Sequence, residues 1–431
     1  MNFEKIKEII TEIYEEVITN KSGEVADYIP QLSQVNPDLF GISVCTIDGY
    51  KFDIGDTKEE FCLQSCSKPL SYCIARELNG LDGVHKHVGY EPSGGKFNAF
   101  ILNKDGKPHN PLINAGSIMV CSLIEPDEEP SHKFDIIHKY YKRASANSHI
   151  GFDTAVFLSE KHHADRNISL AYYMRENGAF NDKMVPSKIN ETLELYFQAC
   201  SITINTDTGA ILSSTLANNG ICPISQERIF ETDVVRDCLS LMYMCGMYDY
   251  SGQFAFEIGL PAKSGVSGCI MLIVPNVMGV CIWSPRLDDN GNSVRGVEVC
   301  KKLNEKTNYI YHIFNNITNK LNQTKKENEQ ILPHILITAS SKGDLNKIKQ
   351  LHGKVDFNEG DYDNRTPLHL AATEGHLDVV QYFLENGVEA DVKDRWGNTP
   401  YHEAHKQCNE SDESEVYVQI CDVIEKYIQA T

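Results

Sequence analysis

The chain of 431 residues is long enough for two or three domains, and its 41% hydrophobic and 23% charged residues are typical of a globular protein. A formal net charge of −20 argues against nucleic acid or an anionic membrane surface as a main partner, because both call for basic patches. The 14 cysteines include no C-x-x-C pair, which indicates reduced thiols in a cytosol-like compartment rather than a metal cluster or a disulfide framework.

Apolar residues recur at helical spacing over residues 3–17, and five glutamates share this stretch. A mitochondrial transit peptide is rich in Arg and poor in acids, so the sequence alone indicates a cytoplasmic protein. The most apolar segment, 269–283, is too short to span a bilayer and is interrupted at Pro275 and Asn276. We expect it to form two core strands joined by a tight turn.

Ser65 and Lys68 form an S-x-x-K pattern at the start of an expected helix, with Pro69 in its first turn. Side chains three residues apart share a helix face, so the amine can take the proton of the hydroxyl without a histidine. About two such matches arise by chance in a chain of this length. The second match, residues 93–96, lies in a Gly-rich turn and has no helical face. The alternative is that Ser65 caps the helix and Lys68 is solvated.

A second element, Lys263-Ser264-Gly265, precedes an apolar run that is typical of a buried strand. Acyl enzymes with S-x-x-K place a Lys-Thr/Ser-Gly strand beside the nucleophile, so the two elements together predict acyl transfer. The sequence Ser145-Ala146-Asn147 matches a third element of such enzymes, but it lies in a polar loop and receives no role. His162-His163 lacks the spacing of a metal site.

Residues 319–330 are rich in Asn, Lys, Glu and Gln, which predicts a linker or an exposed helix. Beyond them, Thr366-Pro367-Leu368-His369 recurs 33 residues later as Thr399-Pro400-Tyr401-His402, the period and motif of ankyrin repeats. Two full units follow a degenerate one, and residues 416–428 are expected to form a capping helix. Such a stack binds protein, or packs on its own catalytic domain or on a sister subunit.

Several further stretches resemble the serine-dependent glutaminases, in particular the animal kidney/liver-type members with C-terminal ankyrin repeats: Phe61–Cys66, His109–Pro111, Asn114–Gly116, Asp165–Asn167, Cys245–Asp249 and Ser251–Ala255. The resemblance implies an α+β fold: a β-lactamase/DD-peptidase-like catalytic domain over residues 1–318, with an antiparallel sheet and a helical subdomain. A linker over 319–330 and a short ankyrin α-solenoid over 331–431 complete the predicted organisation.

The same resemblance implies the roles of nine residues, and the Lys263 element adds a tenth. Ser65 is the expected nucleophile, Lys68 and Tyr248 activate it, and Val266 supplies an oxyanion N–H beside that of Ser65. Lys263 is expected to lower the pKa of Lys68. Glutamine is a zwitterion, so its site needs an anion for the ammonium and neutral donors for the carboxylate. The residues expected to bind it are Tyr28, Ser65, Asn114, Glu160, Asn167, Tyr196, Tyr248 and Val266.

The resemblance also implies L-glutamine as substrate, no cofactor, inorganic phosphate as an activator, and a homo-oligomer, either a dimer or a tetramer, with filament formation. It implies a mitochondrial address, in contrast to the acidic N-terminal helix. Two other classes stay open. A penicillin-recognising hydrolase or peptidase would need no partner for a substrate ammonium, which Glu160 provides. A non-enzymatic ankyrin scaffold would carry a dead catalytic domain.

Overall fold

The computed structural model describes residues 3–180, 184–312, 332–410 and 414–430, and the chain divides into two compact units near residue 316. The linker predicted over 319–330 lies outside the described residues. Each unit has its own hydrophobic core and is described by itself. No helix among the described residues is long and apolar enough to cross a membrane.

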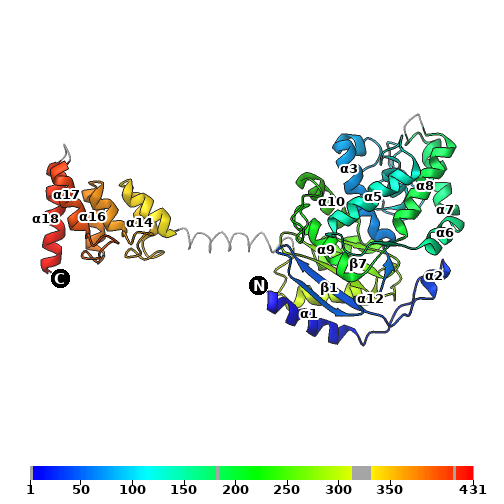
Figure 1. Cartoon of the computed structure of the whole chain (residues 1–431), viewed down its shortest axis with the longest axis horizontal. Coiled ribbons are helices and arrows are strands. Elements are labelled where there is room, and N and C mark those ends of the chain that lie inside the picture. Colours follow the sequence, from blue (N-terminus) through cyan, green and yellow to red (C-terminus); the bar gives the residue numbers. More distant parts are fainter. Residues whose placement is uncertain (1–2, 181–183, 313–331, 411–413, 431) are drawn as a thin grey trace. The chain divides into compact units, whose positions relative to one another are not determined.

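A five-stranded antiparallel sheet forms the centre of the first unit, in the order β2-β1-β8-β7-β6 (Figure 1). The apolar run 269–283 forms β7 and β8, which pair in register and are joined by a turn in which Asn276 adopts a φ of 60°. The expected hairpin is therefore confirmed. The strands are β1 (Gly41–Thr46), β2 (Lys51–Gly55), β6 (Ala262–Ser264), β7 (Cys269–Val274) and β8 (Met278–Trp283).

Strands β1, β7 and β8 are buried on both faces of the sheet, which explains their continuous apolar runs, whereas the edge strand β2 is partly exposed. Successive side chains of a strand point to opposite faces, so Ile270, Leu272 and Val274 enter one core while Met271 and Ile273 enter the other. Helices α1 (Phe3–Val17) and α12 (Val294–Lys306) cover the first face. Helix α9 (Thr206–Ala217) packs on the second.

A helical subdomain adjoins the second face and makes the unit α+β, as expected (Figure 1). A small sheet, β3-β5-β4, lies within it. Its remaining elements are α2 (Pro30–Ser33), β3 (Phe61–Cys62), η1 (Gln64–Ser67), α3 (Lys68–His85), α4 (Asn114–Ser122), α5 (Pro130–Ala144), β4 (Gly151–Phe152), α6 (Thr154–His162), α7 (Asp165–Glu176), α8 (Pro186–Cys200), β5 (Ile202–Ile204) and α10 (Thr232–Cys245). The short elements η2 (Tyr248–Tyr250) and α11 (Ser251–Glu257) instead contribute Tyr250 and Phe254 to the core on the first face.

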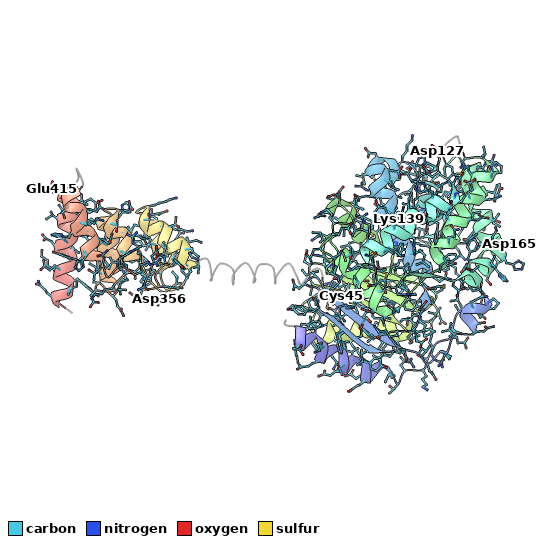
Figure 2. The ribbon with its side chains drawn as sticks, viewed as in Figure 1. Cys45, Asp127, Lys139, Asp165, Asp356 and Glu415 are labelled. Atoms are coloured by element: carbon cyan, nitrogen blue, oxygen red, sulfur yellow. The ribbon has the colours of Figure 1, made fainter. Side chains whose placement is uncertain are left out.

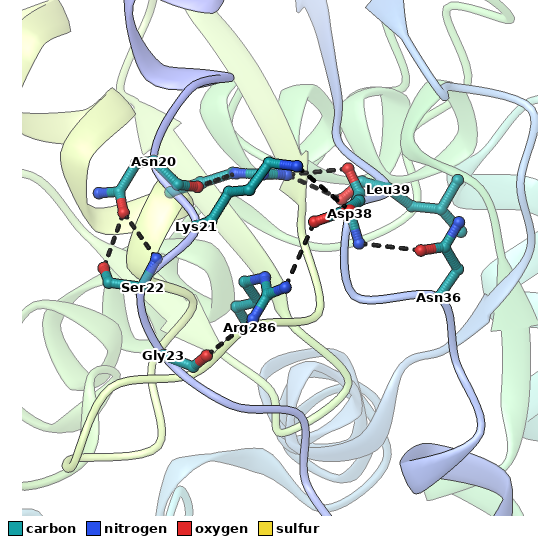
Figure 3. Close-up of polar contacts among 9 residues, drawn as sticks. Asn20, Lys21, Ser22, Gly23, Asn36, Asp38, Leu39 and Arg286 are labelled. Carbon is teal, nitrogen blue, oxygen red and sulfur yellow. Dashed lines mark hydrogen bonds and ion pairs between the residues drawn. The ribbon is translucent and has the colours of Figure 1, made fainter.

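Two arginines fix the N-terminal segment that leads to Tyr28 (Figure 3). The buried Arg295 donates to the carbonyl oxygens of Asn20 at 2.7 Å and Asp38 at 2.9 Å. Arg286 donates to the carbonyl oxygen of Gly23 at 3.1 Å and to the Asp38 carboxylate at 3.3 Å. Hydrogen bonds from charged donors are stronger than those from neutral donors. The segment from Asn20 to Asp38 is therefore held at both ends, although it contains little regular structure.

The second unit stacks paired helices around a separate core. Figure 2 shows its side chains, with Asp356 in one of its turns and Glu415 on its last helix. In the first full repeat, the backbone N–H of Thr366 donates to His369 Nδ1 at 3.1 Å, and His369 Nε2 donates to the Asn398 carbonyl of the next repeat at 3.2 Å. Its helices are residues 332–341, α14 (Leu345–Leu351), α15 (Pro367–Thr373), α16 (Leu377–Glu385), α17 (Pro400–Glu410) and α18 (Ser414–Ala430), the expected cap.

Candidate active site

Ser65 lies in the tight turn η1, between β3 and α3. The preceding Gln64 adopts a φ of 50°, a conformation that is uncommon outside glycine and often marks a functional turn. Ser65 is 8% exposed, and the N-cap residue of α3 is Ser67, not Ser65. The alternative of a capping Ser65 and a solvated Lys68 is therefore wrong, because Lys68 is only 1% exposed.

The Lys68 amine is buried beside polar groups from three helices. Its Nζ donates to Asn114 Oδ1 at 2.7 Å, and Asn114 Nδ2 donates to Asn167 Oδ1 at 3.0 Å. The Tyr196 ring centroid lies 5.9 Å from the same Nζ. Burial lowers the pKa of Lys68 to about 7, and the positive charge of Lys263 adds to this effect. A large fraction of this amine is neutral near physiological pH.

Lys263 lies on β6 and is fully buried. Its Nζ donates to the carbonyl oxygens of Ser264 at 2.6 Å and Gly246 at 3.2 Å, and it lies 4.5 Å from the Tyr248 ring centroid. Burial lowers the pKa of Lys263 to about 8. The Tyr248 hydroxyl is buried without a hydrogen-bond partner of good geometry; burial raises the pKa of Tyr248, while an interaction with the Ser65 side chain opposes that rise.

A carboxylate, Glu160 on α6, receives two hydrogen bonds at its Oε1 atom. The Tyr28 hydroxyl donates to it at 2.6 Å, and Gln64 Nε2 donates at 3.0 Å. Burial raises the pKa of Glu160, and the two donors oppose that rise. Because Gln64 directly precedes Ser65, this carboxylate is tied to the turn that carries the hydroxyl.

Gly265 brings β6 against the Ser65 turn. A side chain at Gly265 would lie 2.8 Å from the Leu63 carbonyl oxygen and 3.4 Å from the backbone nitrogen of Cys66, so only glycine permits this approach. The Cys66 thiol also donates to the Lys263 carbonyl at 3.3 Å. Gly265, which precedes Val266, therefore lies against Leu63 and Cys66, the residues that flank Gln64 and Ser65.

Two cavities meet at Tyr248. One, of about 830 Å³, is lined by Val266, Phe97, the segment 22–25 and the turn 287–291. The other, of about 350 Å³, lies beside the segment 92–97 and the start of α11. The structure links Lys68, Asn114 and Asn167 by hydrogen bonds with Tyr196 beside them. It ties Tyr28 and Glu160 to the Ser65 turn through Gln64, and it places Lys263 and Val266 at Tyr248.

Comparisons with known proteins identify the family of the chain. A sequence profile of the Glutaminase family matches residues 23–314, and a profile of three ankyrin repeats matches 336–413. The chain belongs to the glutaminase family. It is 45% identical to "Glutaminase liver isoform, mitochondrial" of Rattus norvegicus over 413 residues, which cover 94% of this chain and 67% of the rat protein. It is 42% identical to "Glutaminase" of Nostoc sp. over 298 residues, 69% of this chain and 87% of that protein.

The solved structure of "Probable glutaminase ybaS" has the same fold as the first unit. It superposes with a TM-score of 0.68 at 32% identity, and covers 72% of this chain and 98% of that one. The predicted β-lactamase-like α+β fold with C-terminal ankyrin repeats is therefore confirmed. Membership of the glutaminase family also makes the protein a hydrolase acting on glutamine.

The sequence pattern gave no separate role to Gln64, although it links the Ser65 turn to Glu160. Its position next to Ser65, the predicted nucleophile, is the one signal that marks it. Phe97 was likewise not selected; its ring centroid lies 5.0 Å from that of Tyr248, and its carbonyl accepts from the Asn114 N–H at 3.0 Å. Over the described part of the chain, no group of three or more His, Cys, Asp or Glu side chains is placed to hold a metal ion.

Proposed function

We propose that this glutaminase cleaves the side-chain amide of L-glutamine through an ester on Ser65. The observation that carries the proposal is the buried Lys68 amine, one turn from Ser65, whose pKa of about 7 leaves it available as a base. Its bond to Asn114 Oδ1 uses an N–H, so the nitrogen lone pair of the neutral amine stays free. A buried lysine of lowered pKa is a well-characterised way to activate a hydroxyl.

The Ser65 oxygen attacks the carboxamide carbon as its proton passes to Lys68. The backbone N–H groups of Ser65 and Val266 hold the resulting oxyanion, and each such donor typically contributes about 10²- to 10³-fold to the rate. Tyr248 relays the proton to the departing nitrogen, so that the C–N bond breaks and ammonia leaves. Water then attacks the ester, returns the proton to Ser65 and releases L-glutamate.

Recognition of the amino-acid end rests on charge. Glu160 binds the α-ammonium of the substrate, and its carboxylate is held in place by Tyr28 and Gln64. Asn114, Asn167 and Tyr196 act as neutral hydrogen-bonding groups around the α-carboxylate. Glu160 also argues against a penicillin-recognising hydrolase, whose substrates need no free ammonium.

The decisive experiment is a coupled assay for L-glutamate on the wild type and Ser65→Ala. We expect turnover of L-glutamine by the wild type alone, and labelling of Ser65 by an electrophilic glutamine analogue. Undiminished ammonia release by a folded Ser65→Ala protein would overturn the assignment. Labelling of Ser65 by a β-lactam, without turnover of glutamine, would favour the penicillin-recognising class.

The partners and the compartment belong to the same proposal. We infer that the ankyrin unit binds a protein partner or a second copy of the chain, as a dimer or tetramer, because Tyr362 and Trp396 stand exposed on neighbouring repeats with Arg395 against both rings. All 14 cysteines are free thiols, which supports a reducing compartment such as the cytosol or the mitochondrial matrix. Activation by phosphate is tested in the same assay, with and without inorganic phosphate.

A further inference from the structure

Tyr248 has an unusual backbone conformation for a residue with a large side chain. Its φ is 54°, in the left-handed region that bulky residues rarely adopt. Such a conformation persists only where the surrounding structure holds it in place, and it is often found at functional sites. The position of the Tyr248 side chain therefore depends on the groups that fix its backbone.

The hydroxyl of Ser251, the first residue of α11, makes two hydrogen bonds to this backbone. Its Oγ accepts from the Met247 N–H at 2.9 Å and donates to the Tyr248 carbonyl oxygen at 2.7 Å. These two backbone groups lie on either side of the N–Cα bond of Tyr248, so the hydroxyl restrains rotation about φ. The Ser251 side chain is buried, which leaves little room for water to replace these bonds.

Two further side chains hold the carbonyl groups that precede Tyr248. The fully buried Asn292 donates from its Nδ2 to the Met247 carbonyl oxygen at 3.3 Å. Lys263 donates from its Nζ to the Gly246 carbonyl oxygen at 3.2 Å. The carbonyl groups of three consecutive residues, 246 to 248, therefore each accept from a different buried side chain. Of the three, only Ser251 holds the carbonyl of Tyr248 itself.

The backbone conformation of Tyr248 determines where its phenol lies. The hydroxyl interacts with the Ser65 side chain, and the ring lies against the Lys263 amine and 5.0 Å from the Phe97 ring, measured between centroids. A change of φ swings the side chain about the N–Cα bond and takes the hydroxyl away from Ser65. A displacement of about 1 Å in a reacting group can lower the rate by about 10²-fold.

We propose that Ser251 is a positioning residue for the reaction, whose hydroxyl holds Tyr248 in the left-handed conformation that brings the phenol to Ser65. This inference rests on the proposed role of Tyr248 in proton transfer. The Ser251 hydroxyl proton is already engaged by the Tyr248 carbonyl, so Ser251 offers no donor to a substrate. Its contribution is therefore to the chemical step and not to the binding of L-glutamine.

Steady-state kinetics of Ser251→Ala test the proposal. We expect kcat for L-glutamine to fall by about 10- to 100-fold, while the KM changes by less than about threefold, because the residues proposed to bind the amino-acid end are untouched. Ser122→Ala is the matched control. Ser122 is also buried, and its hydroxyl also donates to a carbonyl three residues earlier, that of Met119 at 2.6 Å, but Met119 lies within the regular helix α4. The control should keep the wild-type kcat.

A double-mutant cycle separates positioning of Tyr248 from a general loss of structure. In Tyr248→Phe the phenol is absent, so adding Ser251→Ala should lower kcat by no more than about twofold. Additive losses in the double variant would mean that Ser251 acts on the site independently of Tyr248, and would overturn the proposal. The melting temperature shows that each variant is folded.

The single variants distinguish failure of the inference from failure of the proposed function. A wild-type kcat in Tyr248→Phe overturns the proton relay and the positioning role together. A lowered kcat in Tyr248→Phe with a wild-type kcat in folded Ser251→Ala overturns the positioning role alone.

Asn292→Ala gives a second measurement, which decides the question where Ser251→Ala does not fold. It removes the bond to the Met247 carbonyl and leaves Ser251 in place. We expect it to lower kcat by about 3- to 10-fold in the wild-type chain and by no more than about twofold in Tyr248→Phe, because its bond is longer than those of Ser251. An unchanged kcat in folded Asn292→Ala would show that the backbone of Tyr248 needs no support from these side chains.

Discussion

Buried polar side chains have different roles in the two units. In the ankyrin unit, His369 uses both ring nitrogens, one for the turn of its own repeat and one for the next repeat. In the catalytic unit, the Tyr248 hydroxyl faces Ser65 without a hydrogen bond of good geometry. The neutral Lys68 amine keeps a free lone pair, and burial lowers its pKa. Burial alone therefore does not indicate function. A buried polar group with an unused donor or acceptor at a cavity does indicate function, because a substrate can bind to it.

The largest expected effect tests the catalytic side of this comparison. Ser65→Ala should lower glutaminase activity by about 10³-fold or more, because the ester cannot form. The matched control is Ser93→Ala in the second S-x-x-K match, whose hydroxyl bonds only within its own turn, to the Gly95 carbonyl at 2.8 Å. The coupled glutamate assay should show near-normal activity for the control, and comparable losses in both variants would contradict the assignment.

Lys68→Met should lower kcat by about 10²- to 10⁴-fold, the usual contribution of a general base. It should also raise the free energy of unfolding, because a buried cation gives way to an apolar chain of similar length. Lys133→Met is the control, since Lys133 is also buried but donates to the Pro126 carbonyl, far along the chain from Ser65. Steady-state kinetics and urea denaturation separate the two effects, and a kcat unaffected by Lys68→Met would exclude it as the base.

Glu160→Gln should raise the KM for L-glutamine by about 10- to 100-fold with a smaller change in kcat. The substitution keeps the shape of the side chain but removes the charge that faces the α-ammonium, and hydrogen bonds to charged groups contribute about 1.5–3 kcal/mol. Glu194→Gln, which breaks an exposed pair with Lys161, is the control. A substrate analogue without the α-amino group should lose the difference between wild type and Glu160→Gln.

The pH dependence follows from the pKa of Lys68. Activity needs the neutral amine, so kcat/KM should fall about tenfold for each pH unit below about 7 and level off above it. In the unfolded state Lys68 keeps its proton up to a pH of about 10.4. Between about 7 and about 10.4 the unfolded chain therefore binds more protons than the folded chain, and the free energy of unfolding rises with pH. A pH profile of kcat/KM that stays flat between pH 5 and 7 would contradict the role of Lys68.

Sequence reasoning was most successful where the signal is local or periodic. The apolar run that forms β7 and β8 and the 33-residue repeat of the ankyrin unit follow directly from residue order, and the S-x-x-K spacing located the Ser65 turn. Gln64 was missed because nothing in a single glutamine shows that it faces Glu160, 96 residues away. The assigned roles of the ten site residues are predictions, and the variants above test four of them, Ser65, Lys68, Glu160 and Tyr248.

The smallest expected effect concerns the ankyrin side of the comparison. His369→Ala should destabilise the second unit by about 2–3 kcal/mol, because two hydrogen bonds are lost in a fully buried position and a cavity is left. The same change at His402 should cost about 1 kcal/mol, since this ring is exposed and its bond from the Thr399 N–H is longer, at 3.3 Å. Hydrogen exchange of the full chain, resolved by peptide, measures both. Equal losses at the two histidines would mean that the bond to Asn398 adds nothing, and that the turn alone accounts for the contribution of His369.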